Sequence, residues 1–455
     1  GAGGPGRPDP AGGLRAYAPR ELQLELCRVA DWERPRRSGE MAPSVCPLDA
    51  ARTILEVRSG PLEDVRGTCL LPIVRADGST LSERLRVDPV TRHLCLWDGD
   101  PVPDAVPSRE RANAALLELL EPLIDFPFRA DVDRSVALAL MLTACVRPSC
   151  ESAPLFVLDG HTPGTGKSKI ADVAHLLVTG QRAPRTAPGD DQERPKHLAS
   201  LLSETRPLVL FDNVRGAFGS PALDAALTSE SWSYRVFGTQ TTRTVPCSTT
   251  FVVTGNNVRV GGDLVRRSLR CYLDSPEERP ERRTGFAHPE LEDWVASQRP
   301  RLVRALVDVV RWSASLPDRL DPPPFGSFSS WSRMVREPLV RLGWPDPVAS
   351  QQGLRDESDP EEDAFGALLR LWEKCASGPA TVRDVLLWCR PSSCPLPALS
   401  DEVAEAVEGL CGVPCGSEKA AQRLGLRVRS RAGRRHGGLR LVVADRSNKG
   451  RAYRI

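Results

Sequence analysis

The sequence lacks a long hydrophobic run, a close cysteine pair and an excess of charge of either sign. Its longest apolar stretch spans residues 136–146 and is interrupted by Thr143, whereas a membrane-spanning helix needs about 20 residues. None of the 13 cysteines forms a CxxC pair, the recurrent spacings of zinc ligands are missing, and no stretch resembles a secretory signal. We therefore expect a cytoplasmic protein with reduced cysteines and no membrane partner.

Lysine and aromatic residues are scarce, and the overall charge is close to balanced. Only six of the 61 basic residues are lysine, aromatic residues make up 5% of the chain, and 59 acidic residues leave a net charge of +2. This balance excludes a general polycation that binds nucleic acid over its whole surface. Hydrophobic residues at 40% and charged residues at 26% are typical of a soluble globular protein.

A length of 455 residues favours about three domains. Residues 1–20 are rich in Gly, Pro and Arg, which predicts a flexible segment. An acidic run at 355–363 predicts a linker before a last region, 364–455. From Leu155 onward, short apolar runs alternate with helical stretches, the pattern of an α/β fold with a parallel sheet flanked by helices. We expect strands at 155–159, 207–212, 249–254 and 269–273, and helices at 21–33, 47–58, 167–179, 195–204, 221–230 and 289–315.

A glycine-rich loop lies between the expected strand 155–159 and the expected helix 167–179. In such a loop, glycines bring backbone N–H groups close to phosphate oxygens, and the helix N-terminus adds a favourable dipole. Lys167 is expected to reach the β- and γ-phosphates of ATP, and the Ser168 hydroxyl to bind Mg²⁺. His161 stands where the strict pattern has glycine. The alternative is a glycine-rich loop that precedes Lys-Ser by chance. The predicted ATP-binding residues are Gly160, Pro163, Gly164, Thr165, Gly166, Lys167 and Ser168.

A second acidic position follows the apolar run 208–211. Asp212 ends this run, so its carboxylate is expected near Mg²⁺ across from the loop; the alternative is an aspartate that makes a turn at a strand end. Many ATPases place glutamate next, to polarise the attacking water, whereas this chain has Asn213. An amide orients water but is no base, which weakens the inference of fast hydrolysis and not that of binding. Glu204 and Glu230 are candidate substitutes.

Two β-rich runs within residues 231–251 predict a β-hairpin. They flank the sequence Gly-Thr-Gln-Thr-Thr, which begins at Gly238. Arg235 lies before the expected tip and Arg243 after it. These two arginines are either contacts to a ligand or solvated cross-strand charges.

Polar residues also follow the next two expected strands. Strand 249–254 leads into Asn256, whose amide is able to sense the γ-phosphate or hold the water; the alternative is a turn residue. Arg266 and Arg267 precede the strand at 269–273. Paired arginines there are able to reach a neighbouring subunit's nucleotide and stabilise charge on the transferred phosphoryl group, with one of the two structural.

The order of phosphate loop, strand with Asp212, hairpin, "TGNN" and "RR" resembles the superfamily-3 branch of AAA-plus helicases. More closely, it resembles the helicase proteins of phages, plasmids and other mobile elements, which often carry a primase upstream. The resemblance covers roughly residues 40–455 and is strongest over 125–300, with His161 and Asn213 as departures. It implies a collar or oligomerisation domain over 21–150, an AAA-plus P-loop ATPase domain with its lid over 151–350, a linker over 351–363 and a winged-helix domain over 364–455.

The same resemblance assigns roles to individual residues. In such helicases the hairpin lies in the central pore of a hexamer and grips one DNA strand. Arg243 and residues 239–242, which begin with Thr239, would then be pore contacts, and Arg235 is a further candidate contact to single-stranded DNA. Asn256 would be the sensor, and Arg266 or Arg267 the finger that acts on the neighbouring subunit.

Basic charge is concentrated at the C-terminus. Residues 421–455 hold ten Arg and one Lys against one Asp, a local charge of +10, so the rest of the chain carries −8. Such a stripe is typical of a surface that binds the phosphate backbone of duplex DNA. Helical stretches followed by a two-stranded segment predict a winged helix; the alternative is a solvated tail or a protein-interaction module. The expected contacts are Arg423, Arg427, Arg434, Arg435 and Lys449.

Together these features predict an ATP-dependent DNA helicase or replication initiator of a mobile element, with Lys167, Asp212 and Asn213 at the catalytic centre. One alternative is an AAA-plus DNA-binding scaffold that hydrolyses ATP slowly or not at all, which Asn213 motivates. Another is the helicase part of a larger primase-helicase, with a primase as a possible partner.

Overall fold

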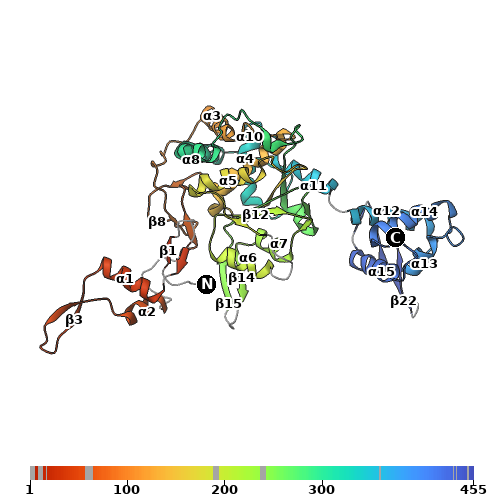
Figure 1. Ribbon diagram of the computed structural model, residues 1–455, viewed down its shortest axis with the longest axis horizontal. Coiled ribbons are helices and arrows are strands. Elements are labelled where there is room, and N and C mark those ends of the chain that lie inside the picture. Colours follow the sequence, from red (N-terminus) through yellow and green to blue (C-terminus); the bar gives the residue numbers. More distant parts are fainter. Residues whose placement is uncertain are drawn as a thin grey trace. The chain divides into compact units, whose positions relative to one another are not determined.

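The computed structural model describes residues 6–8, 14–16, 18–56, 65–187, 194–235, 242–357, 360–433, 435–436, 438–447 and 450–455 (Figure 1). The chain forms two units, Gly1–Leu354 and Arg355–Ile455. The first unit contains two hydrophobic clusters of described residues and the second unit contains one. Within the described ranges, no helix is both long and apolar enough to span a bilayer.

A five-stranded parallel sheet forms the centre of the first unit. The four strands expected from the apolar runs are confirmed, with bounds within two residues of the prediction. The fifth strand has only two residues, too short to leave an apolar run. In sheet order the strands are β11 (Arg185–Thr186), β12 (Leu208–Val214), β16 (Thr250–Gly255), β10 (Leu155–Asp159) and β18 (Ser268–Tyr272).

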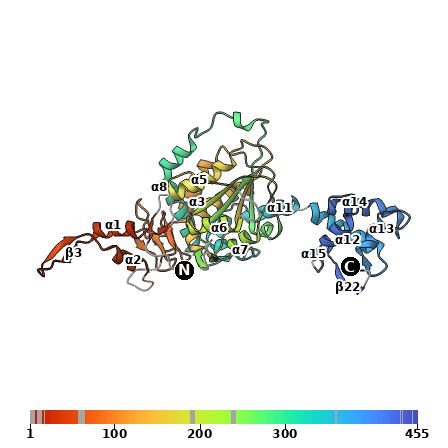
Figure 2. The same cartoon turned by 60° about the horizontal axis from the view of Figure 1, so that its bottom comes forward.

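Helices cover both faces of this sheet, as the alternation of strands and helices predicts. Phe156 and Leu158 point into one hydrophobic cluster, and their neighbours Leu155 and Val157 point into another. The sheet is therefore the middle layer of three, which explains its continuous apolar runs. The first cluster includes α4 (Asp131–Val146), α5 (Lys167–Thr179) and α8 (Leu291–Ala314), and the second α6 (Arg194–Ser203) and α7 (Pro221–Thr228) (Figures 1 and 2).

Residues before the sheet contribute small strands and helices. The helix expected over 21–33 ends at Val29 (α1, Pro19–Val29), because Trp32–Pro35 (β3) pairs instead with Met41–Ser44 (β4). Helix α2 (Leu48–Glu56) follows. Strand β5 (Gly67–Cys69) pairs with β9 (His93–Cys95), and α3 (Arg109–Leu120) packs along α8, where Arg111 Nε lies 2.7 Å from Asp308 Oδ2. These residues from 69 onward share the hydrophobic cluster of α4, α5 and α8.

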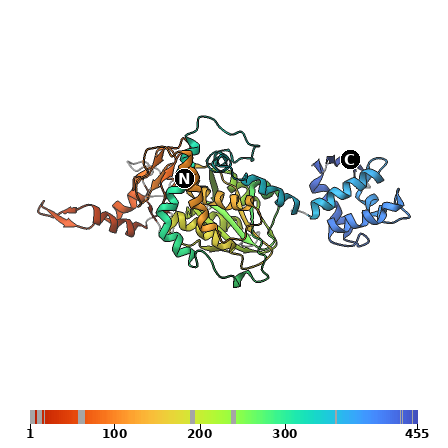
Figure 3. The ribbon, with the colours of Figure 1, turned by 90° about the horizontal axis from the view of Figure 1, so that it is seen from above.

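Among its described residues, the second unit contains the helices α12 to α15, a three-stranded sheet and the short strand pair β20–β21 (blue in Figure 3). Trp372 lies at its centre, with its ring 6.1 Å from that of Trp388 and 6.2 Å from that of Tyr453. The acidic stretch predicted as a linker is helical at 355–357 and 360–363. The helices are α12 (Pro360–Cys375), α13 (Val382–Trp388), α14 (Ser400–Cys411) and α15 (Ala420–Arg431), and the sheet order is β19 (Ala380–Thr381), β23 (Gly450–Arg454) and β22 (Val442–Ser447).

Candidate functional site

The glycine-rich loop connects β10 to α5 at the carboxyl edge of the parallel sheet, beside the ends of β12 and β16. Gly164 and Gly166 have φ angles of +77° and +94°, a region that favours glycine. A Cβ on Gly166 would lie 2.8 Å from the Phe126 ring, and one on Gly164 would lie 3.1 Å from Glu281. The loop is therefore shaped by neighbours that leave no room for side chains. Pro163 and Gly164 are exposed at its tip, and Thr165 is buried.

Lys167 is the first residue of α5, and its side chain folds back into the loop. Its Nζ donates to Thr162 O at 2.8 Å and to Thr165 Oγ1 at 3.2 Å. Burial lowers the pKa of Lys167, and the negative charge of Asp159 offsets part of this shift. The ammonium thus sits within the loop on neutral oxygens, which phosphate oxygens are able to replace with a stronger, charge-assisted bond.

Ser168 and Asp212 meet across the gap between α5 and β12. Ser168 Oγ donates to Asp212 Oδ1 at 2.6 Å, and Thr254 Oγ1 of β16 donates to the same oxygen at 2.5 Å. A β-bulge aims the carboxylate, because Asp212 and Asn213 together stand opposite Thr254 while Phe211 and Val214 pair normally. A serine hydroxyl beside a carboxylate is an oxygen donor set that Mg²⁺ prefers, so these residues fit the predicted metal.

Arg185, which the sequence did not single out, contacts the same carboxylate. Its Nε lies 3.6 Å from Asp212 Oδ2, while its Nη1 and Nη2 donate to Asp172 of α5 at 2.9 and 2.7 Å. Burial alone would raise the pKa of Asp212, but hydrogen bonds from Ser168 and Thr254 and the charge of Arg185 together lower it. Asp212 is therefore a fixed, ionised group.

The asparagines near the loop have different surroundings. Asn213 has a φ of +55°, its side chain is exposed, and its backbone N–H donates to Thr254 Oγ1 at 3.0 Å. Asn256 is also exposed at the end of β16. The neighbouring Asn257 reaches the loop, where its Oδ1 lies 2.6 Å from Nδ1 of His161. The imidazole that replaces a loop glycine thus links the loop to the residue after Asn256.

The two glutamates proposed as substitute bases lie away from this edge. Glu204 precedes β12 and pairs with Arg206 at 2.5 Å. Glu230 precedes the hairpin, and its Oε1 lies 3.5 Å from Arg66 Nη1. Because Asp212 is the fifth residue of β12, at about 3.3 Å per residue the Glu204 backbone is more than roughly 10 Å away from it. Glu230 O accepts from the N–H of Cys247, which precedes β16, at 2.9 Å, so Glu230 also lies towards the amino edge of the sheet and neither glutamate faces the loop.

The expected hairpin is confirmed. Strand β14 (Ser231–Arg235) pairs antiparallel with β15 (Thr242–Pro246), and Ser233 Oγ lies 2.8 Å from Thr244 Oγ1. Arg235 is exposed and stands opposite Thr242 near the tip. The backbone of Arg243 pairs with Tyr234, and Thr239 lies outside the described residues.

Arg266 and Arg267 end a short 3₁₀ helix, Gly262–Arg267, and differ in exposure. The Arg266 side chain is 68% exposed and pairs with Asp263 at 2.6 Å. The Arg267 side chain is 24% exposed, donates to the backbone carbonyl of Asp224 and lies 3.3 Å from Asp263. Of the pair, Arg266 is thus the residue that extends into solvent.

The predicted contacts of the basic tail are only partly described. Arg423 and Arg427 lie on α15, where Arg423 is exposed and its Nη1 donates to Cys411 O at 3.0 Å. The backbone of Arg435 belongs to a short strand, β20 (Arg435–His436). Arg434 and Lys449 lie outside the described residues.

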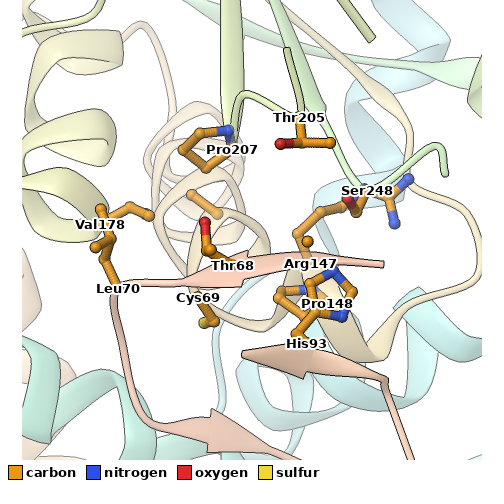
Figure 4. Close-up of a pocket in the computed structure, with 12 residues that line it drawn as sticks. Thr68, Cys69, Leu70, His93, Arg147, Pro148, Val178, Thr205, Pro207 and Ser248 are labelled. Carbon is orange, nitrogen blue, oxygen red and sulfur yellow. The ribbon is translucent and has the colours of Figure 1, made fainter. Parts of the chain in front are cut away.

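A small cavity lies at the amino edge of the parallel sheet, opposite the loop. Figure 4 shows Thr68 and His93 of the small strands beside Pro207 and Ser248, which precede β12 and β16. Its room of about 20 Å³ suits a water molecule and no nucleotide. Arg147 beside it is buried and donates to the backbone carbonyls of Cys247 and Thr249. This cavity is therefore no part of the candidate site.

Comparison with known proteins gives weak similarities. No protein-family description matches the chain, and no curated protein matches it. Among solved structures, it is similar to the apo form of the C-terminal region of NrS-1, with 10% identity, a TM-score of 0.41, and 96% of this chain and 98% of that chain covered. It is also similar to the SCCmec type IV protein Cch, described as an active helicase, with 12% identity, a TM-score of 0.31 and 82% of each chain covered.

Proposed function

We propose that this chain binds ATP with Mg²⁺ at the Gly160–Ser168 loop and hydrolyses it as the motor of a DNA helicase or replication initiator. The observation that carries the proposal is the 2.6 Å contact between Ser168 Oγ and Asp212 Oδ1. It brings a helix that begins at a glycine loop against a carboxylate at the end of a buried strand. This is the pair of oxygens that a metal–triphosphate needs beside a phosphate loop.

The loop residues would divide the work as follows. Backbone N–H groups from Gly164 to Ser168 and the N-terminus of α5 would bind phosphate oxygens. Lys167 would exchange Thr162 O for a β- or γ-phosphate oxygen. Ser168 and Asp212 would hold Mg²⁺, which when bound would offset the negative charge of the phosphates. Asn213 and Asn256, both exposed at the strand ends, would orient the attacking water.

The proposed partners are DNA and further copies of the chain. The hairpin would present Arg235, Thr239 and Arg243 to single-stranded DNA in the pore of a hexameric ring. The last helix and strands of the second unit would act as a winged helix on duplex DNA, which the local charge of +10 supports. Arg266 would reach the nucleotide of the next copy, since its side chain is 68% exposed. A primase remains a possible further partner.

A DNA-binding scaffold with slow or no hydrolysis is the second candidate. The observation that favours it is Asn213 in the place of an acid, together with Glu204 and Glu230 near the amino edge of the sheet, away from the loop. Phosphate binding would then act as a switch. The two candidates differ in turnover and not in nucleotide affinity.

The test compares Lys167→Ala with Lys169→Ala for ATP binding and for hydrolysis with and without single-stranded DNA. Lys169 is a matched control, because it is half-exposed two residues away and pairs with Glu292 at 3.0 Å. We expect Lys167→Ala to abolish hydrolysis and Lys169→Ala to retain it. Hydrolysis that survives Lys167→Ala would show that the loop is misassigned. ATP binding without DNA-stimulated turnover in the intact protein would favour the scaffold.

A further inference from the structure

Arg185 lies on the short edge strand β11, next to the strand that carries Asp212. Its guanidinium faces two carboxylates. Nη1 and Nη2 bind both oxygens of Asp172, at 2.9 and 2.7 Å, and Nε lies 3.6 Å from Asp212 Oδ2. Asp172 is buried and also accepts from the backbone N–H of Ala183 at 3.0 Å. The arginine is thus anchored rigidly on one side and faces the predicted metal ligand on the other.

These contacts form a closed chain that starts and ends on helix α5 and includes both predicted metal ligands. Ser168 and Asp172 lie one turn apart on α5, so they share a face of that helix. Ser168 bonds directly to Asp212, and Asp172 reaches Asp212 through Arg185. Helix α5 therefore holds the carboxylate twice, once through each of its two oxygens.

The two connections differ in what happens when a metal ion is held. A cation held by Ser168 would take a lone pair of the hydroxyl oxygen while the proton stays on it, so the direction of the hydrogen bond to Asp212 Oδ1 would depend on where the cation lies. The contacts of Thr254 and Arg185 with this carboxylate involve no other predicted metal ligand. Of these two, only Arg185 ties it to α5, the helix that also carries Ser168.

We propose that Arg185 is a positioning residue that keeps the Asp212 carboxylate in register with Ser168 while both hold a divalent cation. The inference rests on the proposed function, because it assumes that Ser168 and Asp212 form the metal site. An arginine that merely neutralises Asp212 would act in the opposite direction, since it would compete with the cation and its removal would tighten metal binding.

The variants that separate these roles are Arg185→Gln and Asp172→Asn. The first removes the charge and the bridge, and the second leaves the charge of Arg185 in place but loosens its anchor. Arg182→Gln is the matched control, because Arg182 lies on the same segment, is 65% exposed and contacts Glu292 only at 3.9 Å. Thermal unfolding without nucleotide checks that each variant folds. If Arg185→Gln does not fold, Asp172→Asn is the variant that tests the proposal.

The measured quantity is the Mn²⁺ concentration at which the protein is half-saturated with Mn²⁺ in the presence of a non-hydrolysable ATP analogue. Mn²⁺ binding is monitored by the spin-resonance signal of the ion. Analogue binding in EDTA is the second readout. We expect Arg185→Gln and Asp172→Asn each to raise the half-saturating Mn²⁺ concentration about tenfold, as losses of groups that orient metal ligands do. The double variant should add little more, because both act through one bridge. Binding in EDTA and the Arg182→Gln control should match the original protein.

An unchanged or lowered Mn²⁺ requirement in the folded variants would overturn the positioning role while leaving the proposed function intact. An original protein that binds no analogue with or without metal would instead refute the proposed function, and this inference with it. Equal loss of analogue binding in EDTA and in Mn²⁺ would show that Arg185 supports the loop and not the metal ligands, which also refutes the proposal.

Discussion

The buried imidazole of His93 makes the first unit sensitive to mild acid. His93 belongs to β9 and is 3% exposed. Its ring packs against Gly67 of β5, where an added Cβ would lie 3.0 Å from Cδ2, and its Nδ1 lies 2.9 Å from Thr91 O. Burial lowers the pKa of His93 to about 4. The hydrogen bond to Thr91 O raises this pKa, and the positive charge of Arg147 lowers it.

The sign and size of the effect follow from proton linkage. The unfolded chain binds a proton at His93 below a pH of about 6.5, while the folded chain resists it until about pH 4. Stability from the neutral imidazole is therefore full above pH 6.5 and is lost as the pH falls towards 4. Those two pKa values give a loss of about 1 kcal/mol between pH 7.0 and 5.5, and roughly 3 kcal/mol by pH 4.

Hydrogen exchange of the amides in β5 and β9 measures this loss locally, which avoids treating a two-unit chain as one cooperative transition. The comparison is with His93→Asn, whose side-chain amide replaces the Nδ1 donor to Thr91 but does not titrate. After correction for intrinsic exchange rates, the original protein should lose about 1 kcal/mol more opening free energy than the variant between pH 7.0 and 5.5. Equal losses in both proteins would refute the linkage.

Two further predictions concern the proposed partners. Arg266→Ala should leave thermal stability nearly unchanged but lower ATP turnover of the assembled protein about 10³-fold. Arg267→Ala should lower the free energy of unfolding by roughly 1–2 kcal/mol, because the variant loses the bond to Asp224 O. Calorimetry and turnover assays that give the reverse pattern would exchange the two roles. Replacing Arg423 and Arg427 with glutamine should weaken duplex DNA binding. The slope of log affinity against log salt concentration should fall in magnitude by about 0.9 per lost phosphate contact. Arg370→Gln is the control, because Arg370 is exposed, and an unchanged slope in fluorescence anisotropy would show that α15 does not touch DNA.

The parts of the fold that local sequence determines were predictable. Helix α5 spans the expected residues 167–179 because left-handed glycines, Gly166 and Gly180, bound it at both ends. The buried strands follow from unbroken apolar runs. Strand β11 has two residues and no such run, so its position depends on pairing with β12 and was missed.

The candidate site divides along the same line. Ser168 and Asp212 were predicted by chemistry and spacing, and the structure brings them together. The role of Arg185 depends on the order of strands in the sheet, which composition does not encode. The difference between Arg266 and Arg267 depends on which side of a 3₁₀ turn faces Asp224. The link between His161 and Asn257 likewise joins two loops that only the parallel strands bring side by side.

The buried guanidinium of Arg147 fixes the connection between the hairpin and the central sheet. Residues 247–249 connect the end of β15 to the start of β16, and Arg147 donates to the first and last of their backbone carbonyls. The three-residue connection between the hairpin and the central sheet is therefore held at both of its ends. Strand β16 runs from this connection to the edge where Thr254 donates to Asp212. One buried arginine therefore fixes the point at which the hairpin joins the strand that leads to the candidate nucleotide site.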